Sequence, residues 1–380
     1  MNIGLVTTLD HNIGDDFIRE GLLSVVRTLA PATAFKLTAV NKHLPHTVYP
    51  WWHPMSAAVA AIRPRRRQLR ARALARKYLQ PLGRSRFDCC DIVLQCGTPI
   101  LWEQSHRSEW AEPIWRDVLA RLGPQLPVLN LGGGSCYPWE RPPISLVGDE
   151  DEEFARLMVR AASLTTVRDP LAAQLLASVG GPSPEVIPCP ASLAGQVFTQ
   201  PVRPTRRVLV NYMHGGAHQH WHQAIDPVAW EKVARSVVTY LRRDWEVTLL
   251  CHNAPEATLA AHLWPDLPRV HPNTPREYFL TCRDAAFGVF NRLHAGVALS
   301  GLGIPSVCIG TDTRLLMAET VGLPIHYVGT VTTEKILADV DRLAASRDEM
   351  SRCLLQLRTR TFARYCEVLA PWITRASRRG

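Results

Sequence analysis

The chain has 380 residues, of which 46% are hydrophobic and 20% charged, a composition that excludes a disordered protein. Its length allows two hydrophobic cores of ordinary domain size. The formal net charge of +9 indicates an anionic partner or surface.

The amino-terminal segment MNIGLVTTLDHNIGDD passes from a short apolar run directly into acidic residues, so we expect no export signal. A membrane-spanning helix needs about 18 or more apolar residues. The nearest candidate, residues 296–310, is interrupted by Gly301, Gly303 and Pro305. Ten cysteines are scattered without a CxxC pair, which is typical of buried, reduced thiols. We therefore expect a cytoplasmic protein.

Patterns typical of strands alternate with patterns typical of helices through the first half of the chain. An expected strand at 3–7 precedes a helix with an apolar face, formed by Phe17, Ile18, Leu22, Val25, Val26 and Leu29. Further strands are expected at 35–40, 92–96, 127–131 and 164–167. The proline-bearing stretch 182–204 has few periodic features, and we predict the linker between two domains there.

The same alternation starts again after this stretch. Strands are expected at 207–213, 246–251, 285–290, 306–309 and 326–328. Helices are expected near 228–243, 255–263, 293–300, 313–321 and 332–345, with a final helix at about 347–375. Alternating strands and helices predict parallel sheets covered on both faces.

The predicted fold class is therefore α/β, with two Rossmann-like domains that face each other across a cleft, similar to the GT-B arrangement. The predicted units are 1–195, 205–350 and a C-terminal helix at 351–380. In such folds, ligands bind at the carboxyl ends of the strands.

The segment 291–296, Asn-Arg-Leu-His-Ala-Gly, lies where an expected buried strand ends and a helix begins. Backbone N–H groups at a helix start attract anions, and the guanidinium of Arg292 can bind a phosphate or carboxylate through two N–H groups. His294 is then placed to exchange protons. A helix start with a solvent-exposed arginine and a core histidine explains the same pattern.

Two further segments follow expected strands. In 165–170, Asp169 can cap a helix and Pro170 fits its first turn, which leaves Arg168 at the carboxyl edge of the sheet. A helix start with a solvated arginine is the alternative. In 12–16, Asn12 and Asp15 can offer acceptor groups to sugar hydroxyls, but a turn before an acidic helix start accounts for them equally well.

Residues 285–314 resemble the carboxyl-terminal signature of the polysaccharide pyruvyl transferases. In that family, Arg-Leu-His at a strand end precedes a small-residue helix, a Gly-x-Pro turn, a strand, and an Asp with a basic residue two places on. The matching residues are Arg292-Leu293-His294, Gly303-Ile304-Pro305, Asp312 and Arg314. The family's strand ending in Arg-Asp and its amino-terminal Asn-x-Gly-Asp are similar to residues 168–169 and 12–15.

The chain departs from the family pattern in two places. Residues 96–99 read Cys-Gly-Thr-Pro where a glycine-rich turn is expected, and 189–190 read Cys-Pro where Asp-Pro is expected. The glycines at 132–134 are retained. These departures leave the acceptor and the exact reaction open.

The resemblance implies an enzyme that moves a pyruvyl group from phosphoenolpyruvate onto a sugar or glycan, forming a ketal, with neither a metal nor a cofactor. It assigns donor binding to Arg168, Arg292 and Leu293, and general acid catalysis to His294, with domain closure assembling the site. Acceptor-binding or secondary roles fall to Asn12, Asp15, Asp16, His214 and Asp312. It places the acceptor on unit 1–195 and the donor on unit 205–350.

Two other segments are rich in histidine or in basic side chains. His214, His218, His220 and His222 crowd one segment, but their spacing matches no common zinc site, and a loop lining the cleft is the preferred interpretation. Seven arginines and one lysine lie between Arg63 and Lys77. They form either a solvated basic face or a peripheral contact with an anionic membrane surface that carries a lipid-linked acceptor; nucleic acid is not expected.

Three alternative functions remain open from the sequence. The first is a GT-B glycosyltransferase that uses a nucleotide sugar. The second is a family relative recruited to another donor or to a non-sugar acceptor. The third is a noncatalytic anion-binding protein.

Overall fold

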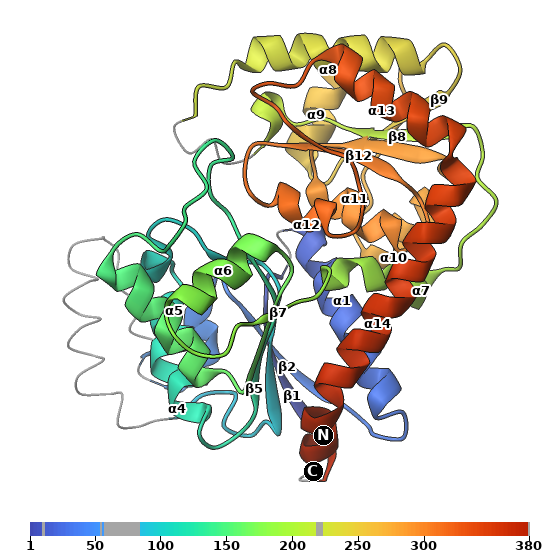
Figure 1. Cartoon of the computed structure of the whole chain (residues 1–380). Helices are drawn as coiled ribbons and strands as arrows, with labels where there is room; N and C mark the ends of the chain where they lie inside the picture. Colours follow the sequence, from blue (N-terminus) through green and yellow to red (C-terminus); the bar gives the residue numbers. More distant parts are fainter. Residues whose placement is uncertain (10–11, 54, 57–83, 218–222, 379–380) are drawn as a thin grey trace.

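The computed structural model describes residues 1–9, 12–53, 55–56, 84–217 and 223–378. These residues form two α/β domains, each built on a parallel sheet (Figure 1). The basic run between Arg63 and Lys77 lies outside the described residues, as do His218, His220 and His222.

The first sheet has the strand order β2-β1-β3-β5-β6-β7, with the short β4 paired to β5, and every pair is parallel. Its strands are β1 (Asn2–Thr7), β2 (Lys36–Asn41), β3 (Ile92–Cys96), β4 (Pro99–Leu101), β5 (Val128–Ser135), β6 (Leu164–Val167) and β7 (Glu185–Val186). The five strands predicted for this half are confirmed within a few residues. β3 and β5 are buried along their whole length, which is why they read as continuous apolar runs.

Alternate residues of these strands face two different cores, as the period of two requires. Ile3 and Leu5 of β1 face the core that contains α1 (Ile13–Leu29). Val6 faces the other core, which is closed by helices on the opposite side of the sheet. The helical elements of this half are η1 (Pro45–Val48), η3 (Ser105–Arg107), η4 (Ala111–Leu119), α4 (Ala120–Leu122), α5 (Asp149–Ala161) and α6 (Pro170–Ser178).

The second sheet has the order β10-β9-β8-β11-β12-β13, again with parallel pairs throughout. Its strands are β8 (Arg207–Asn211), β9 (Glu246–Leu250), β10 (Arg269–Val270), β11 (Phe287–Phe290), β12 (Ser306–Gly310) and β13 (Ile325–Tyr327). Its helical elements are η6 (His214–Gly216), α8 (Pro227–Leu241), α9 (Ala254–Leu263), α10 (Pro275–Cys282), α11 (Leu293–Ser300), α12 (Leu315–Glu319), α13 (Thr333–Ala345) and α14 (Arg347–Ser377). The predicted strands and helices of this half are confirmed, whereas β10 and α10 were not predicted.

One hydrophobic core is shared by the two domains. It contains the apolar face of α1 from the first domain together with residues of α10 and α11 from the second. The ring of Phe17 on α1 lies 4.7 Å from that of Tyr278 and 5.0 Å from that of Phe279, centroid to centroid. The amino-terminal end of α1 is therefore fixed against the second domain.

The last helix, α14, runs from the second domain along α1 to the first (Figure 1). Tyr365, Leu369 and Ile373 are fully buried in the shared core. Arg364 is paired with Glu185 of β7, with 2.6 Å between Nη2 and Oε2. This helix therefore joins the two domains along its length.

The chain crosses between the sheets in the stretch predicted as a linker. This stretch contains β7, η5 (Pro190–Leu193) and α7 (Gly195–Phe198), and Cys189, Ala191 and Leu193 are fully buried. These elements are only two to four residues long, too short to show a helical or strand period, which explains the weak pattern there. The predicted boundaries 1–195, 205–350 and 351–380 stay a prediction.

All ten cysteines are free thiols, and most are buried. In the described parts of the chain, no helix combines the length and the apolar character needed to cross a membrane.

Candidate functional site

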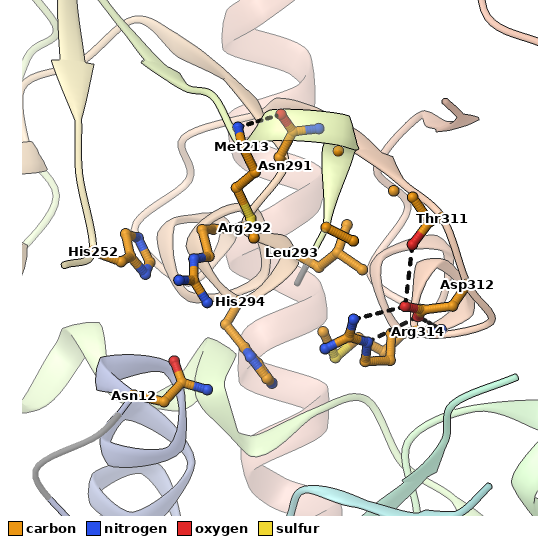
Figure 2. Close-up of a pocket in the computed structure, with 14 residues that line it drawn as sticks. Asn12, Met213, His252, Asn291, Arg292, Leu293, His294, Thr311, Asp312 and Arg314 are labelled. Atoms are coloured by element: carbon orange, nitrogen blue, oxygen red, sulfur yellow. Dashed lines mark hydrogen bonds and ion pairs between the residues drawn. The ribbon is translucent and has the colours of Figure 1, made fainter. Parts of the chain in front are cut away.

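A pocket lies where the carboxyl ends of β11 and β12 face the amino-terminal end of α1 (Figure 2). Its cavity volume is about 40 Å³, and it is partly open to solvent. Its lining residues are Asn12, Met213, Gly216, Ala217, His252, Asn291, Arg292, Leu293, His294, Gly310, Thr311, Asp312, Arg314 and Met317. Two arginines and two histidines among these favour an anionic ligand.

Asn291 holds together the strand ends on which this pocket is built. Its side-chain oxygen accepts from the backbone N–H of Met213 at 3.0 Å, and its Nδ2 donates to the carbonyl of Ile309 at 3.0 Å. The side chain thus ties β12 to the chain segments that follow β8 and β11. Asn291 has a positioning role, which places the following residues, Arg292 to His294, at the sheet edge.

Arg292 lines the pocket, but part of its guanidinium is already engaged in an ion pair. Its Nε donates to Oε1 of Glu256 at 2.8 Å, and its Nη2 contacts the same oxygen. Glu256 is 6% exposed, and its Oε2 accepts from Nδ2 of Asn211 at 3.0 Å and from the backbone N–H of His252 at 2.9 Å. Burial would raise the pKa of Glu256, but the charge of Arg292 holds it below its ordinary value. One edge of the guanidinium is therefore occupied, and Nη1 remains for a ligand.

Arg168 of the first domain meets His294 of the second. Its Nη1 lies 3.1 Å from Nε2 of His294 and 3.9 Å from Sγ of Cys189. Arg168 is fully buried, and its Nε and Nη2 have no hydrogen-bond partner among the described residues. Gly134 permits this placement, because a Cβ there would lie 2.5 Å from Nε of Arg168. The cap that Asp169 was predicted to form is confirmed by its 2.8 Å bond from the N–H of Ala172.

The contact between Arg168 and His294 fixes the state of the imidazole. A guanidinium can only donate, so Nε2 of His294 must accept, and the hydrogen of the neutral ring lies on Nδ1. Burial, followed by the charge of Arg168, lowers the pKa of His294 to about 3. In this structure His294 is therefore a neutral base, not a charged acid.

Asp15, which was singled out from the sequence, lies behind this pair, and its partner is Lys42, which was not singled out. Nζ of Lys42 is 3.7 Å from Oδ2 of Asp15 and is also bonded to the hydroxyl of Thr98. Burial would raise the pKa of Asp15, but the charge of Lys42, together with that of Arg168, more than offsets this, so the carboxyl pKa is lowered. Asp15 is thus an ionised carboxylate held beside two cations of its own domain, Lys42 and Arg168.

Thr98 explains the altered turn after β3. Its φ is 78°, in the left-handed region that a β-branched residue rarely adopts. Glycine would adopt this conformation without strain but would offer no hydroxyl to Lys42. The departure from the family pattern therefore adds a polar contact to the cluster around Asp15.

Asp312 is held by a neighbouring arginine. Nε and Nη2 of Arg314 lie 2.8 and 2.6 Å from its two carboxylate oxygens. Asp312 is 1% exposed, whereas part of Arg314 reaches the pocket (Figure 2). The pair presents a cation, rather than an acid, to a ligand.

Other residues singled out from the sequence lie in different surroundings. Leu293 lines the pocket, as does Asn12, whose Oδ1 caps α1 by accepting from the N–H of Gly14 at 3.2 Å. Asp16 is bound by Arg19 on the same helix at 2.6 Å. His214 is exposed and is not among the lining residues. Within the described ranges, no three His, Cys, Asp or Glu side chains gather as a metal-binding group.

The structure adds three residues that sequence reasoning missed: Lys42, His252 and Glu256. Each follows the carboxyl end of a strand of its sheet, β2 for Lys42 and β9 for the other two. The rule that drew attention to Arg168 and Arg292 could have found them. The same rule would also have selected many residues without a role. Nothing in the sequence shows that Lys42 is paired with Asp15.

Two parallel sheets, with a pocket lined by arginine and histidine side chains at their carboxyl edges, define a two-domain α/β protein of the GT-B type. The family model of the polysaccharide pyruvyl transferases matches residues 12–313, and the chain belongs to this family. A comparison with curated proteins gave no match.

Solved structures agree with the fold at low sequence identity. MnaA from S. aureus, in a structure with UDP, has a TM-score of 0.51 and 11% identity, with 93% of this chain and 90% of that chain covered. The UDP-GlcNAc 2-epimerase from Neisseria meningitidis, bound to UDP-GlcNAc, has the same TM-score and identity over 93% and 94%. A glycotransferase of kitacinnamycin has a TM-score of 0.51 and 15% identity over 99% and 98%. These likenesses show the fold alone.

Proposed function

We propose that the protein transfers a pyruvyl group from phosphoenolpyruvate to hydroxyls of a sugar or glycan, releasing phosphate and forming a cyclic ketal. One observation carries the proposal: Arg168 of the first domain contacts His294 of the second beside a pocket lined by Arg292 and Arg314. Family membership supports the same reaction class.

Phosphoenolpyruvate has a carboxylate and a phosphate, and the site offers cations for both. Arg168 has two buried nitrogens that find no partner in the described parts of the chain, and Arg292 keeps Nη1 available beside its pair with Glu256. Arg314 adds a third charge on the far side of the pocket. In our proposal, Arg168 and Arg292 bind the donor from opposite sides, and no metal or cofactor takes part.

His294 needs a proton before it can act as a general acid. The donor's negative charge would draw the guanidinium of Arg168 away from Nε2 and raise the pKa of the imidazole, which then takes up a proton. That proton passes to the methylene carbon of the donor, and an acceptor hydroxyl attacks the resulting cationic C2. The attacking hydroxyl returns its proton to His294, phosphate leaves, and a second hydroxyl closes the ketal. Of the two hydroxyl protons, one ends in the new methyl group and the other on phosphate.

Domain closure is not required to bring these groups together. The prediction from the sequence was that a hinge motion assembles the site, but Arg168 and His294 already touch, and the shared core holds α1 against the second domain. Local movement of Arg168 is sufficient in this mechanism.

For the acceptor we propose a chemical class and not one particular compound. A lipid-linked glycan at the inner face of an anionic membrane would fit the net charge of +9 and the basic run between Arg63 and Lys77. On this view the enzyme acts in the cytoplasm and binds the membrane peripherally, with Asn12 and Asp15 on the acceptor side.

The test is release of phosphate from phosphoenolpyruvate, measured with a panel of free and lipid-linked glycosides and followed by mass spectrometry of the product. We expect an acceptor-dependent release and a product heavier by one pyruvyl group as its ketal. Failure with every acceptor, together with nucleotide release from a nucleotide sugar, would replace this proposal by a glycosyltransferase activity.

A further inference from the structure

His252 lines the same pocket from the end of β9, next to Arg292 (Figure 2). Its backbone N–H is bound by Glu256, the carboxylate that also holds the guanidinium of Arg292. One acidic side chain therefore sets the positions of both His252 and Arg292.

The imidazole of His252 has one nitrogen with a partner and one without. Nε2 lies 3.2 Å from the hydroxyl of Tyr278, whereas Nδ1 is buried and has no partner among the described residues. A buried N–H or ring nitrogen without a partner costs free energy, which a bound ligand can recover.

Tyr278 decides which nitrogen carries the hydrogen. Its side chain is fully buried, and its ring is packed against Phe17 and Phe279 in the shared core. Nε2 of His252 is the one acceptor recorded for its hydroxyl in the described structure. The phenol O–H must therefore donate to Nε2, and the hydrogen of the neutral imidazole lies on Nδ1.

We propose that His252 is a further ligand-binding residue, whose Nδ1–H donates to a carboxylate or phosphate oxygen held beside Arg292, and that Tyr278 is the positioning residue that fixes this tautomer. The proposal rests on the proposed function for the identity of the anion. It assigns a neutral donor to the site, which adds a hydrogen bond without adding a charge.

The groups around this imidazole agree with a neutral ring. Burial, followed by the charge of Arg292, lowers the pKa of His252 to about 3, with Glu256 opposing and His294 and His271 adding to the effect. A neutral Nδ1–H beside a guanidinium can share an anionic oxygen with it.

The first experiment reads the tautomer directly. In the protein labelled with nitrogen-15 at histidine, the signals of His252 are assigned by their loss in His252→Gln. We expect a protonated Nδ1 and an unprotonated Nε2 in the ligand-free protein. The opposite tautomer would overturn the proposal.

The second experiment measures binding of inorganic phosphate and of phosphoenolpyruvate by calorimetry. We expect His252→Gln to weaken both ligands about tenfold, the loss of one hydrogen bond to a charged group. His252→Asn keeps an N–H near the Nδ1 position and should recover part of this loss. Wild-type affinity in His252→Gln would contradict the proposal.

Tyr278→Phe tests whether Tyr278 acts by positioning His252 and not by contacting the ligand, because this substitution removes no atom from the pocket lining. We expect a loss close to that of His252→Gln and no further loss in the double variant. Tyr212→Phe is the matched control: its hydroxyl is also buried, has no partner within the described ranges and lies outside the pocket, so binding should be unchanged. Independent, additive losses would overturn the role of Tyr278.

These measurements of binding and of the tautomer need no turnover. This inference can therefore fail independently of the proposed function. If phosphate binding depends on His252 and Tyr278 but no acceptor supports phosphate release from phosphoenolpyruvate, the proposed function fails and this inference stands. If turnover is found but neither variant changes binding or the tautomer, this inference fails alone.

Discussion

His294 packs directly against the backbone of Gly14 at the start of α1. A Cβ at Gly14 would lie 2.7 Å from Nδ1 of His294 and 2.8 Å from its Cβ and Cγ, closer than real Cβ atoms approach other atoms. The glycine is therefore required for the imidazole to reach Arg168. We predict that Gly14→Ala displaces the imidazole and lowers phosphate release by about tenfold to a hundredfold, as expected for a misplaced catalytic group.

The control for this prediction is a double-variant cycle with His294→Gly, which removes the Cβ of residue 294 as well as its imidazole. Alanine is a better helix residue than glycine by about 1 kcal/mol, so Gly14→Ala should stabilise the protein once both are absent. The melting temperature of the two single variants and the double variant gives the coupling between the sites. A melting temperature raised equally in both backgrounds would show that the two residues do not press on each other.

Replacement of His294 tests the proton transfer itself. We predict that His294→Gln lowers turnover by about a hundredfold to ten-thousandfold, the usual contribution of a general acid or base. Affinity for phosphoenolpyruvate should stay largely intact, because Arg168 and Arg292 supply the charge. Single-turnover phosphate release and calorimetry measure the two quantities separately, and unchanged turnover would remove the role assigned to His294.

Replacement of Arg292 should change the affinity for the donor rather than the rate of the chemical step. We predict that Arg292→Ala weakens phosphoenolpyruvate binding by about tenfold to a hundredfold, the value of a hydrogen bond to a charged group in a buried site. Glu256→Gln keeps the shape but weakens the hold on Arg292, and we expect a smaller loss of affinity. Equal donor affinity in wild type and Arg292→Ala would place the donor elsewhere.

The fold could be predicted from the sequence because buried parallel strands are continuous apolar runs. Strands such as β3 and β6 were predicted at their observed bounds, and helix starts at Asp169-Pro170 follow local capping rules. Very short elements were missed: β7 has two residues and α7 has four, too few to show a period in the sequence. Their conformation depends on contacts with both domains.

The site was predicted in part for a similar reason. Polar residues at strand ends can be seen in the sequence, and Arg168 and His294 were expected to meet. Their partners could not be predicted, since Glu256 reaches Arg292 from the helix that follows another strand. The state of His294 also depends on burial and on Arg168, 126 residues away in the chain, so the expectation of a ready acid required correction.

The two pocket histidines should make the stability of the protein depend on pH. The pKa of both His252 and His294 is lowered to about 3 from an ordinary value of 6.5. Between these values the unfolded chain binds protons on both side chains and the folded chain does not. The free energy of unfolding must therefore rise with pH in this window and fall as the pH drops below about 6.5. Urea denaturation between about pH 5 and 7 should show this slope, and His252→Gln/His294→Gln should reduce it by up to two protons. His262→Gln, on the exposed surface of α9, is the control, and a slope unaffected by the double variant would show that the two imidazoles are not held neutral by the fold.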